Sequence, residues 1–140
     1  MRVVLDTNVL ISAFITRGVC SDLLERCATQ HTLVTSSFIL DEFHDKITSK
    51  FKYSEEDATR AIQLLRSRME IAIPEDFPLN VCRDPDDDMI LATAIAGNAS
   101  CIVTGDPDLT DLRYFLNIAI LKPAEFATYE ASKQTQCPPS

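Results

Sequence analysis

The sequence predicts an α/β fold in which helices cover both faces of a parallel sheet. Short apolar runs rich in β-branched residues alternate with segments of helical periodicity along the whole chain, which is the pattern of strands joined by helical crossovers. The runs are apolar on successive positions, as in strands that are buried on both sides. A chain of 140 residues is the usual size of one domain, so we expect three layers, α/β/α, in a single domain.

The first expected strand is RVVLD, residues 2–6. Helical spacing follows in TNVLISAF, so Asp6 falls where the strand becomes a helix. A second helix is expected at 21–28, where Ser21 suits the N-cap position. The opening of the chain therefore predicts a strand and two helices, with an acid at the end of the strand.

The middle of the chain repeats the strand-then-helix order. TLVTS at 32–36 is the next expected strand, and helical spacing continues over 37–51. A further helix over 53–69 opens with a capping signature at Ser54, and a short strand is expected at 69–73.

The last third begins with a loop at 75–85 that contains two prolines. The helix that follows should end at Gly97 and Asn98, which are good residues for a left-handed C-terminal cap. The remaining expected elements are strands at 100–106 and 117–121 and a short helix at 123–133. We expect residues 1–130 to form the domain and residues 131–140 to be a flexible tail.

Composition limits the possible functions. The formal net charge of −8 is the wrong sign for a protein that holds nucleic acid on a broad basic face, so any such contact would be local. No apolar run reaches the roughly 20 residues of a membrane helix, and Asp6 interrupts the first apolar run where a signal peptide would continue. The expected location is the cytoplasm. Zinc is disfavoured because the sequence has no close cysteine pair or histidine cluster.

Carboxylates from four separate segments are expected at one edge of the sheet. In parallel sheets with helices on both faces, ligands bind outside the carboxyl ends of the strands. Two of the acids end strands, one lies in the first turns of the helix after the second strand, and one begins the helix near position 88. At 100° per residue, Asp88 shares its side with Leu91 and Ile95 and is therefore directed into the apolar layer. The four are Asp6, Glu42, Asp88 and Asp106.

Each acid has a purely structural alternative. Asp84 can cap the helix, and acids in a first turn complement its dipole for about 0.3 to 1 kcal/mol each. Four converging carboxylates, however, would repel one another by about 4 kcal/mol per pair at 4 Å in an effective dielectric near 20. A divalent cation would neutralise them, and an all-oxygen site selects Mg²⁺ or Mn²⁺. A pair of such metals suits phosphodiester hydrolysis.

The chain resembles the PIN domain family and, within it, the VapC-like toxins of prokaryotic toxin–antitoxin systems. The resemblance is carried by LDTNVL, SSFILDEF, the segment from DDDMILATA to TGDPDL, and ILKPAEF. It implies a five-stranded parallel sheet between helices and Mg²⁺- or Mn²⁺-dependent cleavage of RNA. It also implies a homodimer and an antitoxin partner protein.

The resemblance also assigns residues. The family's acidic quartet corresponds to the four carboxylates named above, as catalytic residues and metal ligands. Asn8 matches a polar residue after the first aspartate, and Thr104 matches a hydroxyl two positions before the last acid. Asp108 can share or replace the role of Asp106, and Asp84 or Asp87 can hold waters on the metal.

Substrate contacts are less sharply indicated. Lys46, Lys50 and Lys52 interleave with aromatic residues, a combination that can bind phosphates and stack a base. The alternative is a solvated helix end whose lysines complement the dipole. Two other functions stay open: a catalytically inactive PIN-fold module that binds RNA or protein, and a phosphatase of the haloacid dehalogenase type. The phosphatase motif requires a second aspartate where Asn8 stands.

Overall fold

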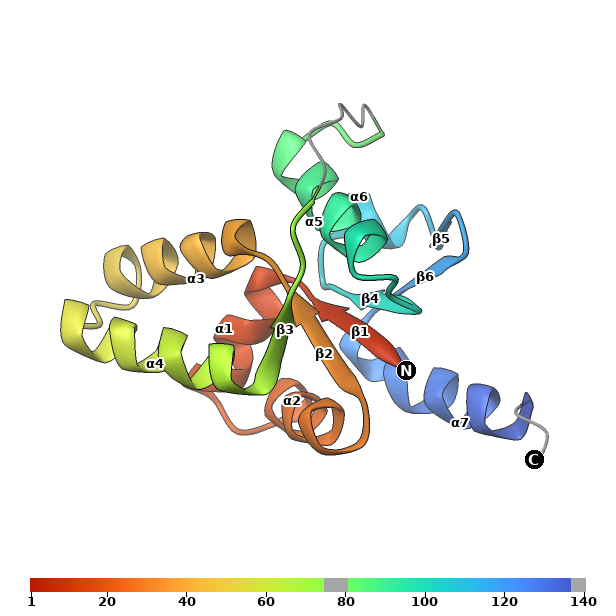
Figure 1. The fold of residues 1–140 in the computed structure, drawn as a ribbon, viewed down its shortest axis with the longest axis horizontal. Helices are drawn as coiled ribbons and strands as arrows, with labels where there is room; N and C mark the ends of the chain where they lie inside the picture. Colours follow the sequence, from red (N-terminus) through yellow and green to blue (C-terminus); the bar gives the residue numbers. More distant parts are fainter. Residues whose placement is uncertain (75–80, 137–140) are drawn as a thin grey trace.

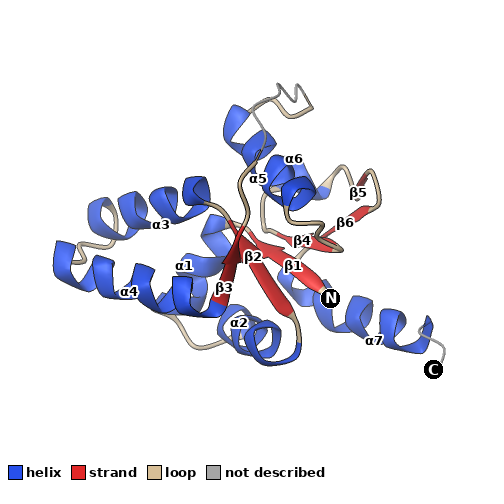
Figure 2. Cartoon of the chain, in the orientation of Figure 1, coloured by secondary structure: helices blue, strands red, loops and turns tan. Residues whose placement is uncertain are grey.

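A six-stranded sheet forms the centre of the computed structural model, which describes residues 1–74 and 81–136. The strand order is β3-β2-β1-β4-β6-β5, in which the first five strands are parallel and β5 pairs antiparallel with β6 (Figures 1 and 2). The strands are β1 (Arg2–Leu5), β2 (Thr32–Thr35), β3 (Met69–Ile71), β4 (Cys101–Val103), β5 (Tyr114–Phe115) and β6 (Ile118–Leu121).

Helices cover both faces of the sheet. α5 contacts β1 and β2 on one face, whereas α1 to α4 form a connected group on the other (Figure 1). This division follows from right-handed crossovers, because the strand order runs one way from β1 to β3 and then reverses to β4. The helices are α1 (Thr7–Ile15), α2 (Val19–Gln30), α3 (Ser37–Ser49), α4 (Glu55–Arg68), α5 (Pro85–Ala96), α6 (Pro107–Thr110), the 3₁₀ helix η1 (Pro123–Glu125) and α7 (Phe126–Gln136).

The predicted three-layer α/β/α architecture and its five parallel strands are confirmed. The strand β5, which the sequence did not predict, adds a sixth at the edge. It is only two residues long and lies between Arg113 and Leu116, whose backbones adopt positive φ angles of 61° and 55°. So short a strand has no room for a recognisable alternating pattern, and no sequence signal therefore predicts it.

Side-chain caps define several helix starts. Ser54 accepts from the Asp57 backbone N–H at 3.0 Å, and Asp84 accepts from the Asp86 N–H at 2.9 Å, both as the sequence predicts. Ser21 differs from the prediction because α2 begins two residues earlier, at Val19. Its hydroxyl accepts from the backbone N–H of Gly18 at 2.9 Å, the role of the third helical residue in a capping box.

The C-terminal helix continues farther than the sequence predicts. α7 runs to Gln136, so the first part of the expected tail at 131–140 is helical. The rest of that tail, 137–140, and most of the expected loop at 75–85 lie outside the described residues. Of the helices in the described ranges, none combines the length and apolar character needed to cross a membrane.

The strands β1 and β4 form the centre of the core. Val3, Val4 and Leu5 of β1, like Ile102 and Val103 of β4, are at most 1% exposed. Because the strand order reverses between β1 and β4, their carboxyl ends form the topological switch point at which open α/β sheets bind ligands. The residues that follow these two strands are therefore the first candidates for a ligand-binding site.

Candidate metal centre

Asp6 lies at the switch point, directly after β1. Its backbone N–H donates to the Val103 carbonyl at 3.0 Å, which ties the ends of β1 and β4 together. One carboxylate oxygen accepts from the Thr7 N–H and the other from the Thr104 hydroxyl, each at 2.6 Å. Asp6 thus caps α1 as the structural alternative requires, and both of its oxygens are oriented by neighbours. Its side chain nevertheless lies among other acids.

The pKa of Asp6 is raised above its ordinary value. Burial is the main cause, and the charges of Glu42 and Asp106 add to it, while the hydrogen bonds from Thr104 and Thr7 oppose it. Glu42 and Asp106 are therefore close enough for their charges to raise the pKa of Asp6. These are three of the four acids that the sequence placed at this edge.

A tighter cluster contains Asp87, Asp106 and Asp108. Carboxylate oxygens of the three residues all lie within 4.8 Å of one another. Asp106 caps the four-residue helix α6 by accepting from the Asp108 N–H at 2.9 Å. Its own N–H donates to the Thr104 hydroxyl at 3.0 Å, so Thr104 bridges Asp6 and Asp106.

Asp87 is the most strongly perturbed acid of the cluster. Its pKa is raised to about 7 by burial first, then by a side-chain hydrogen bond with Asp106 and by the charges of Asp106, Asp84 and Asp6. Only 7% of its surface is exposed. Asp87 is thus a buried carboxylate beside the charges of other acids, which is the electrostatic situation that a cation would relieve.

Asp88 is oriented differently from what helical phase predicts. It is half-buried, and its carboxylate accepts from the backbone N–H of Cys82 at 2.9 Å, in the segment that leads into α5. The phase argument failed because α5 is apolar nearly all round, so that the side shared with Leu91 and Ile95 is not its only buried side. The structure brings Asp87, and not Asp88, against Asp106.

Burial, which the sequence alone does not show, distinguishes Asp87 from its neighbour. Positions three, four and seven residues after it are Ile90, Leu91 and Ala94, each at most 2% exposed, so Asp87 lies on the most deeply buried line of the helix. Asp84 is exposed and caps α5, and its charge acts on Asp87. From the family resemblance, both residues were expected to have only supporting roles.

Few cations lie close to these acids. Arg83 pairs with Asp108 at 3.1 Å, but the arginine side chain is 89% exposed, so the pair contributes little. Lys46 donates to the Asn8 side chain at 3.3 Å, across the junction of α3 and α1. Lys50 ends α3 and Lys52 is exposed, with no carboxylate partner for either among the described residues.

The donor set fits a hard divalent cation. Mg²⁺ and Mn²⁺ bind oxygen ligands, and Mg²⁺–oxygen distances of about 2.0 to 2.1 Å place the ligand atoms of one ion at most roughly 4 Å apart. Oxygens of Asp87, Asp106 and Asp108 that lie within 4.8 Å of one another need only small adjustments to share one ion. The described residues at this site include no cysteine or histidine ligand, in keeping with an oxygen-binding metal.

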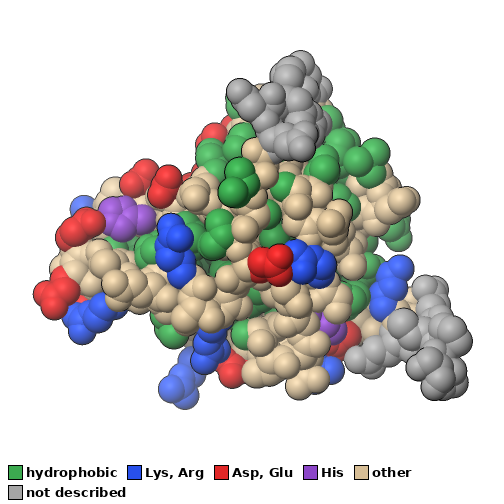
Figure 3. Space-filling view, viewed as in Figure 1, with side chains coloured by type: hydrophobic (Ala, Val, Ile, Leu, Met, Phe, Trp, Pro, Cys, Tyr) green, Lys and Arg blue, Asp and Glu red, His purple; other side chains and the backbone are tan. Residues whose placement is uncertain are grey.

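The face drawn in Figure 3 shows no broad basic platform for nucleic acid. On the face drawn in Figure 3, acidic and basic side chains are interspersed and no continuous basic area is visible. With a net charge of −8, electrostatic contacts to an anionic polymer on this face would be local.

The fold is that of a known class of protein. Residues 2–108 match the PIN domain family. The chain is also 35% identical over 118 residues to the uncharacterized protein MJ1680 of Methanocaldococcus jannaschii, covering 81% of this chain and 76% of that protein. The chain therefore belongs to the PIN domain family, as the sequence motifs indicated.

Solved structures from two other organisms have a similar fold. One is VapBC2 from Rickettsia felis bound to a DNA fragment from their promoter, with a TM-score of 0.62, 21% identity, and coverage of 86% of this chain and 97% of that chain. Another is VapBC-1 from nontypeable Haemophilus influenzae, with a TM-score of 0.62, 19% identity, and coverage of 89% and 99%. At these identities the likeness establishes the fold.

Proposed function

We propose that this PIN domain is a metal-dependent ribonuclease that hydrolyses RNA phosphodiester bonds at the acidic centre. The observation that carries the proposal is the meeting of Asp87, Asp106 and Asp108 within 4.8 Å, beside buried Asp6 at the switch point of the sheet. Placement of this kind is where α/β folds bind ligands, and the donor set suits Mg²⁺ or Mn²⁺.

Carboxylates of this chain would hold the metal, and neighbouring side chains would orient them. Asp87, Asp106 and Asp108 would hold the metal, with Asp6 and Glu42 beside them. Asp88 adjoins Asp87 in α5, so the roles of these two acids need separate tests. Bound there, Mg²⁺ or Mn²⁺ would supply positive charge against the phosphodiester and a lowered pKa for water. The Thr104 hydroxyl donates to the Asp6 carboxylate and accepts from the Asp106 backbone N–H, so it orients the first acid and holds the backbone that carries the second. Lys46 and Asn8, which contact each other, would reach a substrate phosphate.

A cellular role as the toxin of a toxin–antitoxin pair accords with the similarity to VapBC complexes. In this proposal the partner is an antitoxin protein, and the active form is a homodimer. The competing function is a PIN-fold module that binds RNA or protein without cleaving it. The family match leaves the phosphatase alternative without support.

The test is cleavage of single-stranded RNA by purified protein in EDTA, Mg²⁺ or Mn²⁺, compared with Asp6→Asn. Asparagine retains an oxygen that can accept one of the two hydrogen bonds of Asp6 but removes its charge. We expect metal-dependent cleavage by the parent and its loss in the variant, with the fold checked by circular dichroism. No cleavage by the parent with any metal would favour the non-catalytic module, and cleavage that survives in Asp6→Asn would indicate a contaminating nuclease.

A further inference from the structure

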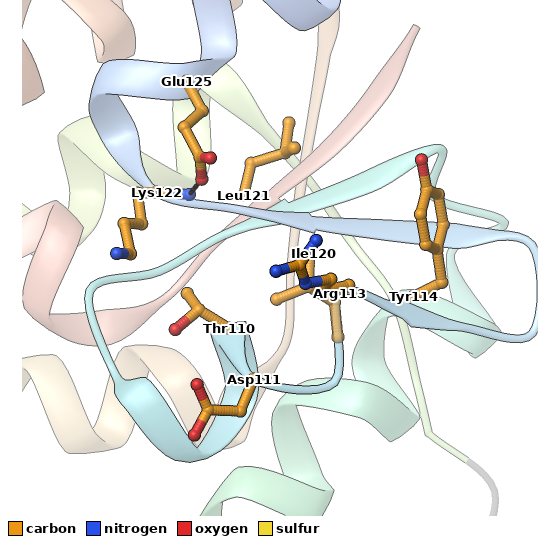
Figure 4. Close-up of a pocket in the computed structure, with 8 residues that line it drawn as sticks. All are labelled: Thr110, Asp111, Arg113, Tyr114, Ile120, Leu121, Lys122 and Glu125. Carbon is orange, nitrogen blue, oxygen red and sulfur yellow. Dashed lines mark hydrogen bonds between the residues drawn. The ribbon is translucent and has the colours of Figure 1, made fainter.

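A second site lies next to the acidic centre, at the carboxyl end of β6. A pocket of about 480 Å³ is lined by eight residues, a volume within the range of small-molecule sites. Figure 4 shows these residues on α6 and the segment after it, on β5, on β6, and on η1 and the residue before it. They are Thr110, Asp111, Arg113, Tyr114, Ile120, Leu121, Lys122 and Glu125.

The pocket is joined directly to the acidic centre. The Thr104 N–H donates to the Leu121 carbonyl at 2.9 Å, so the strand ends that precede Asp106 and Lys122 are neighbours. The helix α6 also runs from its cap at Asp106 to Thr110 in the pocket wall. Four helical residues rise about 6 Å. A strand of RNA that leaves the acidic centre along α6 would therefore reach the pocket within a nucleotide or two.

Two cations in the pocket have no carboxylate partner in the part of the chain that the structure describes. Neither the Arg113 guanidinium nor the Lys122 ammonium takes part in an ion pair, whereas Arg2, Arg26, Arg60, Arg68 and Arg83 all do. Two acids, Asp111 and Glu125, also line the pocket. The Glu125 carboxylate accepts from the Lys122 backbone N–H at 2.8 Å, and among the described residues neither acid forms an ion pair with the two cations. The two side chains are thus free to bind an anion beside a centre that is otherwise strongly acidic.

An exposed aromatic ring completes the pocket. Tyr114 is 67% exposed, and in Figure 4 Arg113 lies between it and Lys122 along β6. Arg113 holds its position with a φ of 61°, a backbone region that costs a non-glycine residue about 1 kcal/mol or more. A phosphate-binding pair of cations beside a stacking surface is the combination that binds single-stranded nucleic acid.

We propose that this pocket binds a nucleotide of the RNA substrate that flanks the scissile bond, with its phosphate held by Arg113 and Lys122 and its base stacked on Tyr114. The inference rests on the proposed ribonuclease function and names the part of the chain that holds the substrate. RNA is favoured over a protein partner because the pocket is polar, carries unpaired cations, and continues into the centre where phosphodiester chemistry would occur.

Binding of a fluorescent single-stranded RNA to the Asp6→Asn protein in Mg²⁺ tests the proposal without cleavage. We expect the double variant Arg113→Gln/Lys122→Gln in that background to weaken binding on the order of tenfold, and the slope of log affinity against log salt to fall by roughly 0.7 per cation removed. Tyr114→Ala should weaken binding about tenfold with the salt slope unchanged, because stacking is not ionic.

The matched control is Arg17→Gln in the same Asp6→Asn background. Arg17 is exposed, lies between α1 and α2, and is outside the pocket. We expect this variant to bind RNA like the Asp6→Asn protein. If the double variant binds RNA as tightly as the Asp6→Asn protein, or if Arg17→Gln loses as much affinity per charge, the pocket is not an RNA site.

The outcomes for pocket and catalysis are separable. RNA binding that depends on Arg113 and Lys122, in a protein whose parent form cleaves nothing, would keep the pocket and reject the ribonuclease. Metal-dependent cleavage by the parent, together with unchanged RNA binding in the double variant, would reject the pocket and keep the ribonuclease.

Discussion

Asp87 and Asp88 are neighbours in α5 whose carboxylates have different surroundings. Asp87 is buried against Asp106, whereas Asp88 accepts from the Cys82 backbone N–H. The Asp87 carboxylate therefore lies beside another acid, whereas the hydrogen bond of Asp88 holds the segment that precedes α5. This difference provides a matched test of which residue serves the proposed metal centre.

We expect Asp87→Asn to reduce metal-dependent RNA cleavage by more than about 100-fold, the upper end of what the loss of an outer-shell partner costs. Asp88→Asn keeps an oxygen that can accept the Cys82 N–H and should retain activity within about tenfold, because Asp88 is not one of the three clustered acids. Initial cleavage rates at saturating Mg²⁺ measure both. The reverse order of effects would assign the site to Asp88, as helical phase suggested.

For single residues, the sequence predicted which acids lie at the edge of the sheet better than it predicted where their side chains point. Asp6 and Asp106 could be placed because each ends a strand, and strand ends in a parallel sheet share an edge. Asp87 could not be separated from Asp88, since the side chains around α5 are buried on almost every side. Where a helix has no exposed face, periodicity carries little information about which acid points inward.

The elements pack closely where α5 ends over β2. A Cβ atom added to Gly97 would lie 2.4 Å from Cγ1 of Val34 and 3.3 Å from the carbonyl of Thr93. Val34 is β-branched and 1% exposed, so its side chain has no free rotamer into which it can move. Gly97 has an ordinary negative φ of −91°, and Asn98 takes the left-handed position with a φ of 52°. Gly97 is therefore required for space and not for its backbone freedom.

We expect Gly97→Ala to lower the free energy of unfolding by about 1 to 3 kcal/mol, the usual cost of overpacking a core. Urea denaturation followed by circular dichroism measures it. Gly105→Ala is the control, because no atom lies within 4 Å of its added Cβ. Adding Val34→Ala to Gly97→Ala should recover part of the loss relative to the sum of the single variants. Strict additivity would show that the contact with Val34 is not the cause.

The ends of helices and strands can be predicted from the sequence where their causes are local, and cannot where they depend on distant residues. The caps at Ser54 and Asp84 are made by residues within three positions of their partners, so the sequence predicts them well. The strand β5 exists only because it pairs with β6, where Tyr114 lies opposite Ala119. A two-residue strand that depends on its partner leaves no mark in local composition.

Over the whole molecule, the fold concentrates negative charge at one end of its sheet. Buried Asp6 and Asp87 both have raised pKa values, and each is raised in part by the charges of other acids. The protein must therefore tolerate this repulsion at neutral pH or bind a cation there. Alternation of strands and helices predicted this convergence from the sequence, because it fixed the sheet as parallel and so placed the acids together.

This arrangement predicts how stability depends on pH and metal. The pKa of Asp87 is raised from 3.8 to about 7, so between these values the folded state binds more protons than the unfolded state, and stability falls as pH rises. In EDTA we expect the thermal midpoint to drop by on the order of 5 °C between pH 5 and pH 8, and Asp87→Asn to show a clearly smaller drop.

Millimolar Mg²⁺ or Mn²⁺ should raise the midpoint of the parent at pH 8 more than at pH 5, since the metal binds deprotonated carboxylates. Differential scanning fluorimetry across pH, with Na⁺ at matched ionic strength as control, measures these shifts. A midpoint that responds equally to Mg²⁺ and to Na⁺ would mean that the carboxylates at the switch point do not form a divalent-cation site.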